Sequence, residues 1–285
     1  MILILQLREV PSLAITPFGA LIAYNPGRHN CTQLYFDETR MTVEYFTTLE
    51  PKNPSRWLIT SDHASNHVPE WVNGGDLGLP AADMERHIAY DIGAAGVTHA
   101  LATALGATAI LSNFSRLVID PNRGERDPTL LMRLSDGTII PANHHADAAE
   151  KERRLDRLHR PYHAALADLA ARRDDTVICS VHSFTPQMRG RPPRPWEIGV
   201  LYADDDRLAR PLIAACEAMG WCVGDNAPYV GYFPDDAIDR HATAHNRPNV
   251  LIELRNDLIA DAAGQALWAG RLAPILDKVL ADTGL

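Results

Sequence analysis

Two histidines each follow directly after an apolar segment of this 285-residue sequence. His63 comes soon after Arg56–Ser61 (RWLITS), and His182 comes directly after Thr176–Val181 (TVICSV). Such runs predict buried strands, and polar residues at the carboxyl ends of strands gather at one edge of an α/β sheet. Two imidazoles that meet there suit a zinc-like divalent metal, whereas either one alone is more simply a hydrogen-bonded histidine. Together they are candidate metal ligands.

A segment rich in arginine offers candidate anion-binding groups. Ser115–Arg123 (SRLVIDPNR) contains a further expected strand over Arg116–Ile119, with Arg116, Asn122 and Arg123 around it. The planar fork of arginine suits bidentate binding of carboxylates. The alternative is salt bridging with the acidic residues nearby. In either case the segment would place positive charge near the end of a strand.

A carboxylate lies near the end of a third apolar run. Asn249–Leu254 (NVLIEL) predicts a strand that contains Glu253, and Arg255 lies two residues further on, on the same face of the strand. Burying a carboxylate is costly unless the group is paired or functional. Glu253 is therefore a candidate functional carboxylate, and Arg255 beside it a candidate substrate-binding residue. The alternative is a structural pair between the two.

Two weaker groups complete the candidates. Arg194–Trp196, whose arginine is a further candidate for substrate binding, could wall a pocket together with Asn226–Tyr229, or both could pack as rigid turns. His87 and Asp91 lie four residues apart in a helix expected over Asp83–Leu105, and so on one face of it. They could orient metal ligands or pair on the helix surface.

Strand and helix signals alternate along the chain, and this alternation must position the candidate residues. Strands are expected over Arg56–Ser61, Ala107–Leu111, Arg116–Ile119, Thr176–Val181, Glu197–Tyr202 and Asn249–Leu254. Helices are expected over Asp83–Leu105, Asp147–Arg173 (interrupted at Pro161), Arg207–Met219 and Ala262–Leu280. Such alternation predicts a layered α/β fold with helices on both faces of the sheet.

The composition excludes several classes of protein. With 46% hydrophobic and 22% charged residues, the chain is not disordered throughout. A formal net charge of −9 without a basic run argues against partners such as nucleic acid or an anionic membrane. The four cysteines form no CxxC pair, which favours reduced thiols in a cytoplasmic enzyme. No apolar run is long enough to span a membrane.

The first 40 residues differ from the rest. Residues 1–40 show no clear helical or strand period and are interrupted by Pro11, Pro17, Pro26 and Gly27. We expect either a mis-called start codon, with translation beginning at Met41, or a genuine N-terminal strand and loop. Residues 41–285 are then a single catalytic domain.

Seven motifs, in order along the chain, resemble the N-formylglutamate amidohydrolase family. They run from about Trp57 to Leu258 and read SDHASNHVP, HIAYDIGA, SRLVIDPNR, PYH, HSFTP, NAPY and LIELRND. The family is distantly similar to zinc carboxypeptidases and aspartoacylases. The resemblance implies an α/β three-layer sandwich with a mixed, largely parallel central sheet of the phosphorylase/hydrolase-like kind, and one Zn²⁺ per chain.

The resemblance also implies roles for individual residues. In the wider group the metal ligands come from an HxxE motif and a later histidine. His63 and His182 match the histidines, and Asn66 stands where the glutamate would be. A neutral amide is a poorer zinc ligand than a carboxylate, so Asp91 or Asp62 could complete the site instead.

The catalytic glutamate of the family matches Glu253, and its carboxylate-binding pair matches Asn122 and Arg123. Arg116 is our candidate for stabilising the oxyanion. The expected reaction is hydrolysis of a small anionic N-acyl amino acid such as N-formylglutamate, with release of formate.

Two rivals remain. One is a zinc carboxypeptidase-like peptide hydrolase, and the other is a non-catalytic sensor of an acidic metabolite. The sequence carries no signal for the oligomeric state.

Overall fold

The chain divides into two compact units, Met1–Met41 and Thr42–Leu285. The structure is a computed structural model that describes residues 13–15, 20–25, 30–35, 40–42 and 45–285. The first unit contains the strands β1 (Leu13–Ile15), β2 (Ala20–Asn25) and β3 (Asn30–Tyr35), which pair in antiparallel order, and β4 (Arg40–Thr42) lies at the boundary. Part of segment 1–40 lies outside the described residues, and a translation start at Met41 stays a prediction.

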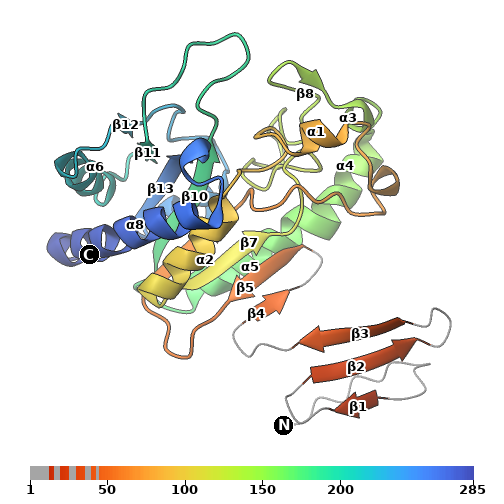
Figure 1. Cartoon of the computed structure of the whole chain (residues 1–285), viewed down its shortest axis with the longest axis horizontal. Helices are drawn as coiled ribbons and strands as arrows, with labels where there is room; N and C mark the ends of the chain where they lie inside the picture. The colour runs from red at the N-terminus through yellow and green to blue at the C-terminus, as the bar shows by residue number, and fades with distance from the viewer. Residues whose placement is uncertain (1–12, 16–19, 26–29, 36–39, 43–44) are drawn as a thin grey trace. The chain divides into compact units, whose positions relative to one another are not determined.

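A mixed sheet forms the centre of the second unit (Figure 1). Seven of its strands follow the order β12-β11-β13-β10-β6-β7-β5. Four of the six pairings among them are parallel, and those of β11 with β13 and of β5 with β7 are antiparallel. The strands are β5 (Phe46–Leu49), β6 (Trp57–Ser61), β7 (Thr108–Ser112), β10 (Val177–Phe184), β11 (Ile198–Leu201), β12 (Val223–Asp225) and β13 (Asn249–Arg255).

Helices cover both faces of this sheet. One face packs against α2 (Ala94–Leu105), α6 (Ala209–Ala218) and α8 (Ala262–Thr283). The other packs against α5 (Arg160–Ala171) and α7 (Ala237–His241). The central strands are buried on both sides, and in β6 Ile59 faces the first layer while Leu58 faces the second. The expected α/β three-layer sandwich with a mixed, largely parallel sheet is confirmed.

Short elements connect the main strands and helices. The stretch between β6 and α4 supplies most of a separate apolar cluster that includes Phe114, Leu117 and Ile140. This stretch contains η1 (Asn73–Gly75), α1 (Ala81–Met84), β8 (Leu134–Ser135), β9 (Thr138–Ile139) and α3 (Pro141–His144), while η3 (Thr243–His245) and η4 (Asn256–Leu258) lie before and after β13. Among the described residues, no helix is long and apolar enough to cross a membrane.

The helix expected over Asp83–Leu105 is wrong in its first half. Helix α1 ends at Met84, α2 begins at Ala94, and turns connect them. Gly93 precedes α2 with a φ of 82°, a left-handed conformation that breaks the helix. The Asp91 amide donates to the His63 carbonyl instead (2.9 Å). His87 and Asp91 therefore do not share a helix face.

The strand expected over Arg116–Ile119 is also wrong. These residues form a turn, in which the Val118 amide donates to the Ser115 carbonyl (2.9 Å) and the Ser115 hydroxyl accepts from Leu117 (3.2 Å). The apolar side chains of 117–119 are fully buried in the loop cluster rather than in the sheet. Burial of a short apolar run therefore gave a strand-like pattern without sheet pairing.

The helical segment expected over Asp147–Arg173 is confirmed, but its interruption differs. Helix α4 (Ala148–Arg154) passes through a π-helical turn, η2 (Leu155–His159), into α5. Pro161 lies in the first turn of α5, so the irregular turn precedes the proline. A proline ring has no N–H and clashes with the turn before it, which a wider π turn relieves.

We predict that Gly93→Ala destabilises the protein by more than about 2 kcal/mol, because a left-handed backbone disfavours alanine and its Cβ would lie 2.1 Å from the Ile259 carbonyl oxygen. The matched control is Gly106→Ala at the other end of α2, where φ is 58° and the space is open, so the loss should be about 1 kcal/mol. Urea unfolding measures both. Equal losses would contradict the role of the close approach.

Candidate active site

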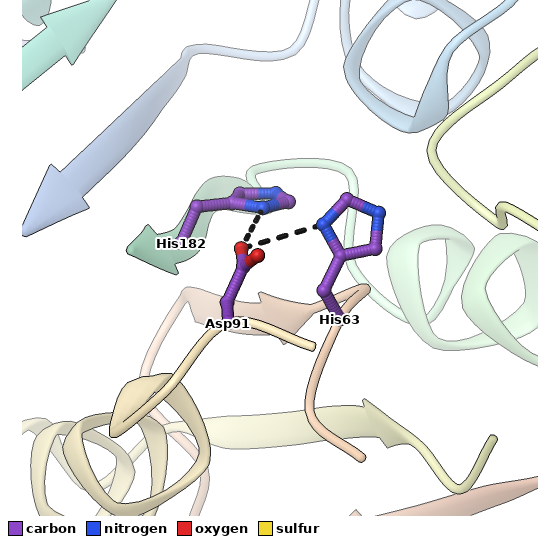
Figure 2. Close-up of side chains that lie close together, drawn as sticks. All are labelled: His63, Asp91 and His182. Atoms are coloured by element: carbon purple, nitrogen blue, oxygen red, sulfur yellow. Dashed lines mark hydrogen bonds and ion pairs between the residues drawn. The ribbon is translucent and has the colours of Figure 1, made fainter. Parts of the chain in front are cut away.

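Three buried side chains meet at the carboxyl edge of the sheet (Figure 2). His63 follows β6, His182 lies within β10, and Asp91 precedes α2. Their ligand atoms lie within 4.8 Å of one another. The Asp91 carboxylate lies between the rings, with its Oδ2 2.8 Å from Nδ1 of His182 and 3.3 Å from Nδ1 of His63. Two imidazoles and a carboxylate are a donor set that zinc accepts.

Each imidazole is held on its other nitrogen by a buried carboxylate. Nε2 of His63 lies 2.7 Å from Oδ1 of Asp120. Nε2 of His182 lies 3.1 Å from the Ser180 hydroxyl and 3.4 Å from Oδ2 of Asp62. The other oxygen of Asp62 accepts from the Tyr162 hydroxyl (2.6 Å). Such outer carboxylates orient metal-ligating histidines and raise their basicity. Both Nδ1 atoms are thereby left for a metal.

The charges of this cluster favour a cation. Burial raises the pKa of Asp91, but the neighbouring His63 and His182 outweigh it and hold the pKa below its ordinary value. The same balance lowers the pKa of Asp120, mainly through Arg116, and of Asp62, mainly through His182. When the histidines are neutral, the three carboxylates of this cluster and the Arg116 guanidinium together carry a net charge of −2. The carboxylates are those of Asp62, Asp91 and Asp120. A divalent cation would neutralise this net charge, so the donor set fits a metal in charge as well as chemistry.

Glu253 lies beside this cluster. It pairs in register with His182 on β10, and Gly199 on β11 lies on its other side. Burial raises the pKa of Glu253 to about 8. The neighbouring His182 opposes this rise in pKa, and the neighbouring Asp91 adds to it. Its Oε2 atom is buried and has no hydrogen-bond partner among the described residues. An unpartnered buried carboxyl group in a cavity wall is a candidate for acid–base chemistry.

A cavity of about 170 Å³ opens beside these groups. His63, Asp91, His182 and Glu253 all line it. Arg116, the candidate for stabilising the oxyanion, also lines it, as do two of the candidate substrate-binding residues, Asn122 and Arg123. Arg116 donates to Asp120 (2.9 Å) and lies 3.4 Å from Asp91, so it also ties the arginine-rich turn to the cluster.

The other candidates lie elsewhere. The Asn66 amide donates to the Met84 carbonyl (3.0 Å) and to Glu85 (3.2 Å), and Asn66 does not line the cavity. Arg255 pairs with Asp257 (2.8 Å) outside the lining. Arg194 is also outside it and donates to the hydroxyl of Tyr229, which does line the cavity (3.1 Å).

Two buried acids near the cavity lie outside the residues that the sequence singles out. The contact of Asp120 with His63 spans 57 residues, so no spacing rule predicts it. Asp236, which caps α7 and lines the cavity, gave no signal except its position before a helix. Burial raises the pKa of Asp236 to about 6.

Three further histidines form a buried stack beneath the arginine-rich turn. Nδ1 of His163 lies 2.8 Å from Nε2 of His241, and the rings of His159 and His163 lie 4.4 Å apart. His163 donates to the Pro121 carbonyl and His159 to the Arg123 carbonyl, each at 2.9 Å. These contacts fix the backbone that carries Asn122 and Arg123.

Comparisons with known proteins bear on the family and the fold. The family model described as N-formylglutamate amidohydrolase matches residues 55–260. No curated protein matches the chain.

Several solved structures are similar to this one, including the following two. The gene product Atu2144 from Agrobacterium tumefaciens is 34% identical, with a TM-score of 0.79 over 85% of this chain and 97% of that chain. The N-formylglutamate amidohydrolase from Ralstonia eutropha JMP134 is 21% identical, with a TM-score of 0.57 over 85% of this chain and 98% of that one. At that identity the second match shows the fold alone.

The histidine stack predicts a loss of stability in mild acid. Burial lowers the pKa of His241 from 6.5 to about 4. Between these values the unfolded chain binds a proton that the folded protein does not, so stability falls as the pH drops. His241→Gln should remove roughly 3 kcal/mol of this loss, at about 1.4 kcal/mol per pKa unit.

Urea midpoints of metal-free protein between pH 7.5 and 4.5 measure this effect. The control is His67→Gln, which replaces an exposed histidine and should keep the parent's slope. A His241→Gln slope equal to that of the parent would contradict the prediction.

Proposed function

The chain belongs to the N-formylglutamate amidohydrolase family, and from this premise we propose that it hydrolyses the amide bond of a small N-formyl amino acid in a zinc-dependent reaction. N-formylglutamate is the substrate after which the family is named. The observation that carries the proposal is the unpartnered carboxyl group of Glu253, buried beside the His63–Asp91–His182 cluster in a cavity wall. A binding protein would need no acid–base group there.

The metal would be held by Nδ1 of His63, Nδ1 of His182 and a carboxylate oxygen of Asp91. When bound, it supplies Lewis acidity that polarises the substrate carbonyl and lowers the pKa of water. Asp120 and Asp62 keep the two imidazoles oriented from behind. Asp91 takes the place of Asn66 in our assignment, because its oxygen contacts both rings and the Asn66 amide is directed to Met84.

Glu253 would move the protons of the reaction. Its carboxylate takes a proton from the attacking water as the new C–O bond forms on the formyl carbon. It then delivers this proton to the amine nitrogen as the C–N bond breaks, so that formate and the free amino acid leave. Burial keeps the proton affinity of Glu253 high, and a nearby dication favours its ionised form.

Arginines would stabilise the negative charges. Arg116 lines the cavity next to Asp91, and we assign to it the oxyanion that develops on the carbonyl oxygen. Arg123 and Asn122, on the turn that the histidine stack holds, would bind the α-carboxylate of the substrate. Arg194 would position the side chain of Tyr229, to whose hydroxyl it donates a hydrogen bond.

We predict that Glu253→Gln lowers kcat for formate release from N-formyl amino acids by about 10²–10⁴-fold, because the amide cannot accept the proton. The variant keeps its size and its bound zinc. Formate release and metal content are measured on the same samples, with N-acetylglutamate as the test of the acyl group. A zinc-loaded variant with full turnover would rule out this role, and release of acetate alone would overturn the deformylase assignment.

The third metal ligand is tested by a pair of variants. Asp91→Asn should weaken zinc binding by about 10–100-fold or more, since a neutral amide replaces the carboxylate between the imidazoles. Asn66→Ala should bind zinc like the parent protein. Competition with a chromophoric chelator gives both affinities. The opposite pattern, with zinc lost from Asn66→Ala and kept by Asp91→Asn, would transfer the ligand role to Asn66.

A further inference from the structure

The cations around the cavity are unequally available to a substrate. Arg116 is occupied by two carboxylates, at 2.9 Å from Asp120 and 3.4 Å from Asp91. His87 also lines the cavity, and burial lowers its pKa, which favours its neutral form. Of the arginines that line the cavity, Arg123 has no carboxylate partner in the described part of the chain.

Arg123 and its neighbour form a site for one carboxylate. The Arg123 guanidinium stacks over the Phe233 ring at 4.4 Å and donates to the Asn122 carbonyl (2.7 Å) and the Thr129 hydroxyl (3.3 Å), which fixes its orientation. The Asn122 side-chain oxygen accepts from the Ala237 amide (3.2 Å), so its NH₂ group is directed away from that bond. One guanidinium and one amide can bind a single carboxylate with two or more hydrogen bonds.

A second carboxylate would find no further guanidinium free of carboxylate partners among the described residues that line the cavity, whereas acids do line it. Asp91, Asp236 and Glu253 all line it. Both oxygens of Asp236 already accept backbone amides, from Asp239 (2.8 Å) and Phe233 (3.3 Å). Arg194, which could have offered a second positive charge, lies outside the lining and donates to Thr185 and Tyr229. A dianionic substrate would therefore leave one of its charges without a partner.

Much of the remaining wall is apolar, although Ser135, Ser183, Thr185 and Tyr229 also line it. Its apolar part is formed by side chains from several elements: Met132, Phe184, Met188, Leu201, Ile238 and Leu251. Burial against this wall stabilises an apolar side chain of the substrate. A charged side chain would lose its hydration there without gaining a partner. The two methionines are flexible and adapt to substrates of differing shape.

We propose that the preferred substrate is an N-formyl amino acid with one carboxylate and an apolar, uncharged side chain, rather than N-formylglutamate. The α-carboxylate lies on Arg123 and Asn122, and the side chain lies against the apolar wall. This inference rests on the proposed deformylase function and narrows its substrate class. It departs from the acidic substrate that the sequence led us to expect.

The test compares three substrates of similar length with the zinc-loaded full-length protein. N-formyl-L-methionine, N-formyl-L-glutamine and N-formyl-L-glutamate differ in the polarity and charge of the side chain. We expect kcat/KM for formate release to be at least about ten-fold higher for the methionine substrate than for the glutamate substrate, with glutamine between them. Equal or faster hydrolysis of N-formylglutamate would overturn the inference and leave the proposed function intact. Release of formate from none of the three would overturn both.

A charge placed at the cavity rim gives a second, independent test. Val230 lines the cavity and is 62% exposed, so its replacement should not affect folding. Val230→Arg should raise the kcat/KM ratio of N-formylglutamate to N-formylmethionine several-fold, because it provides the missing cation. The matched control Val230→Gln adds a polar side chain without charge and should leave the ratio unchanged. An unchanged ratio in Val230→Arg, or the same rise in both variants, would contradict the shortage of positive charge.

Discussion

The buried Asp91 carboxylate is the group on which the rest of the site depends. It is 4% exposed, and an isolated charge at such a position would be very costly. Its stability comes from the two imidazoles on one oxygen and from Arg116 on the other. These partners come from the end of β6, from β10 and from the turn after β7, so three separate segments of the chain meet at this carboxylate. A metal ion would bind where these groups already converge.

The sheet order explains why the candidate catalytic groups are neighbours. Strands β6, β10 and β13 are parallel and adjacent, so their carboxyl ends lie at one edge. The pairing of His182 with Glu253 places the proposed metal ligand and the proposed proton acceptor side by side on the cavity wall. In our proposal the surrounding acids would balance a dication and leave little positive charge for the substrate, so the electrostatics that favour a metal would also restrict which side chains are accepted.

Much of the fold could be predicted from the sequence, because apolar runs such as TVICSV have few alternatives to a buried strand. His63, His182 and Glu253 were found because each stands near the end of such a run. The environment of Asp91 could not be predicted, since the pattern around it resembles one helix, whereas turns connect α1 to α2 and Gly93 precedes α2 in a left-handed conformation. The contact of Asp120 with His63 depends on tertiary packing between distant segments, which periodicity does not encode.

The central claim is that the His63–Asp91–His182 cluster holds a metal required for amide hydrolysis. The most direct measurement is a zinc titration of metal-free protein, with formate release followed from a mixture of N-formyl amino acids. Our account predicts that the rate rises linearly with added zinc and reaches a plateau at one equivalent per chain. Formate release by the metal-free protein at the full rate, unaffected by zinc or chelator, would contradict it.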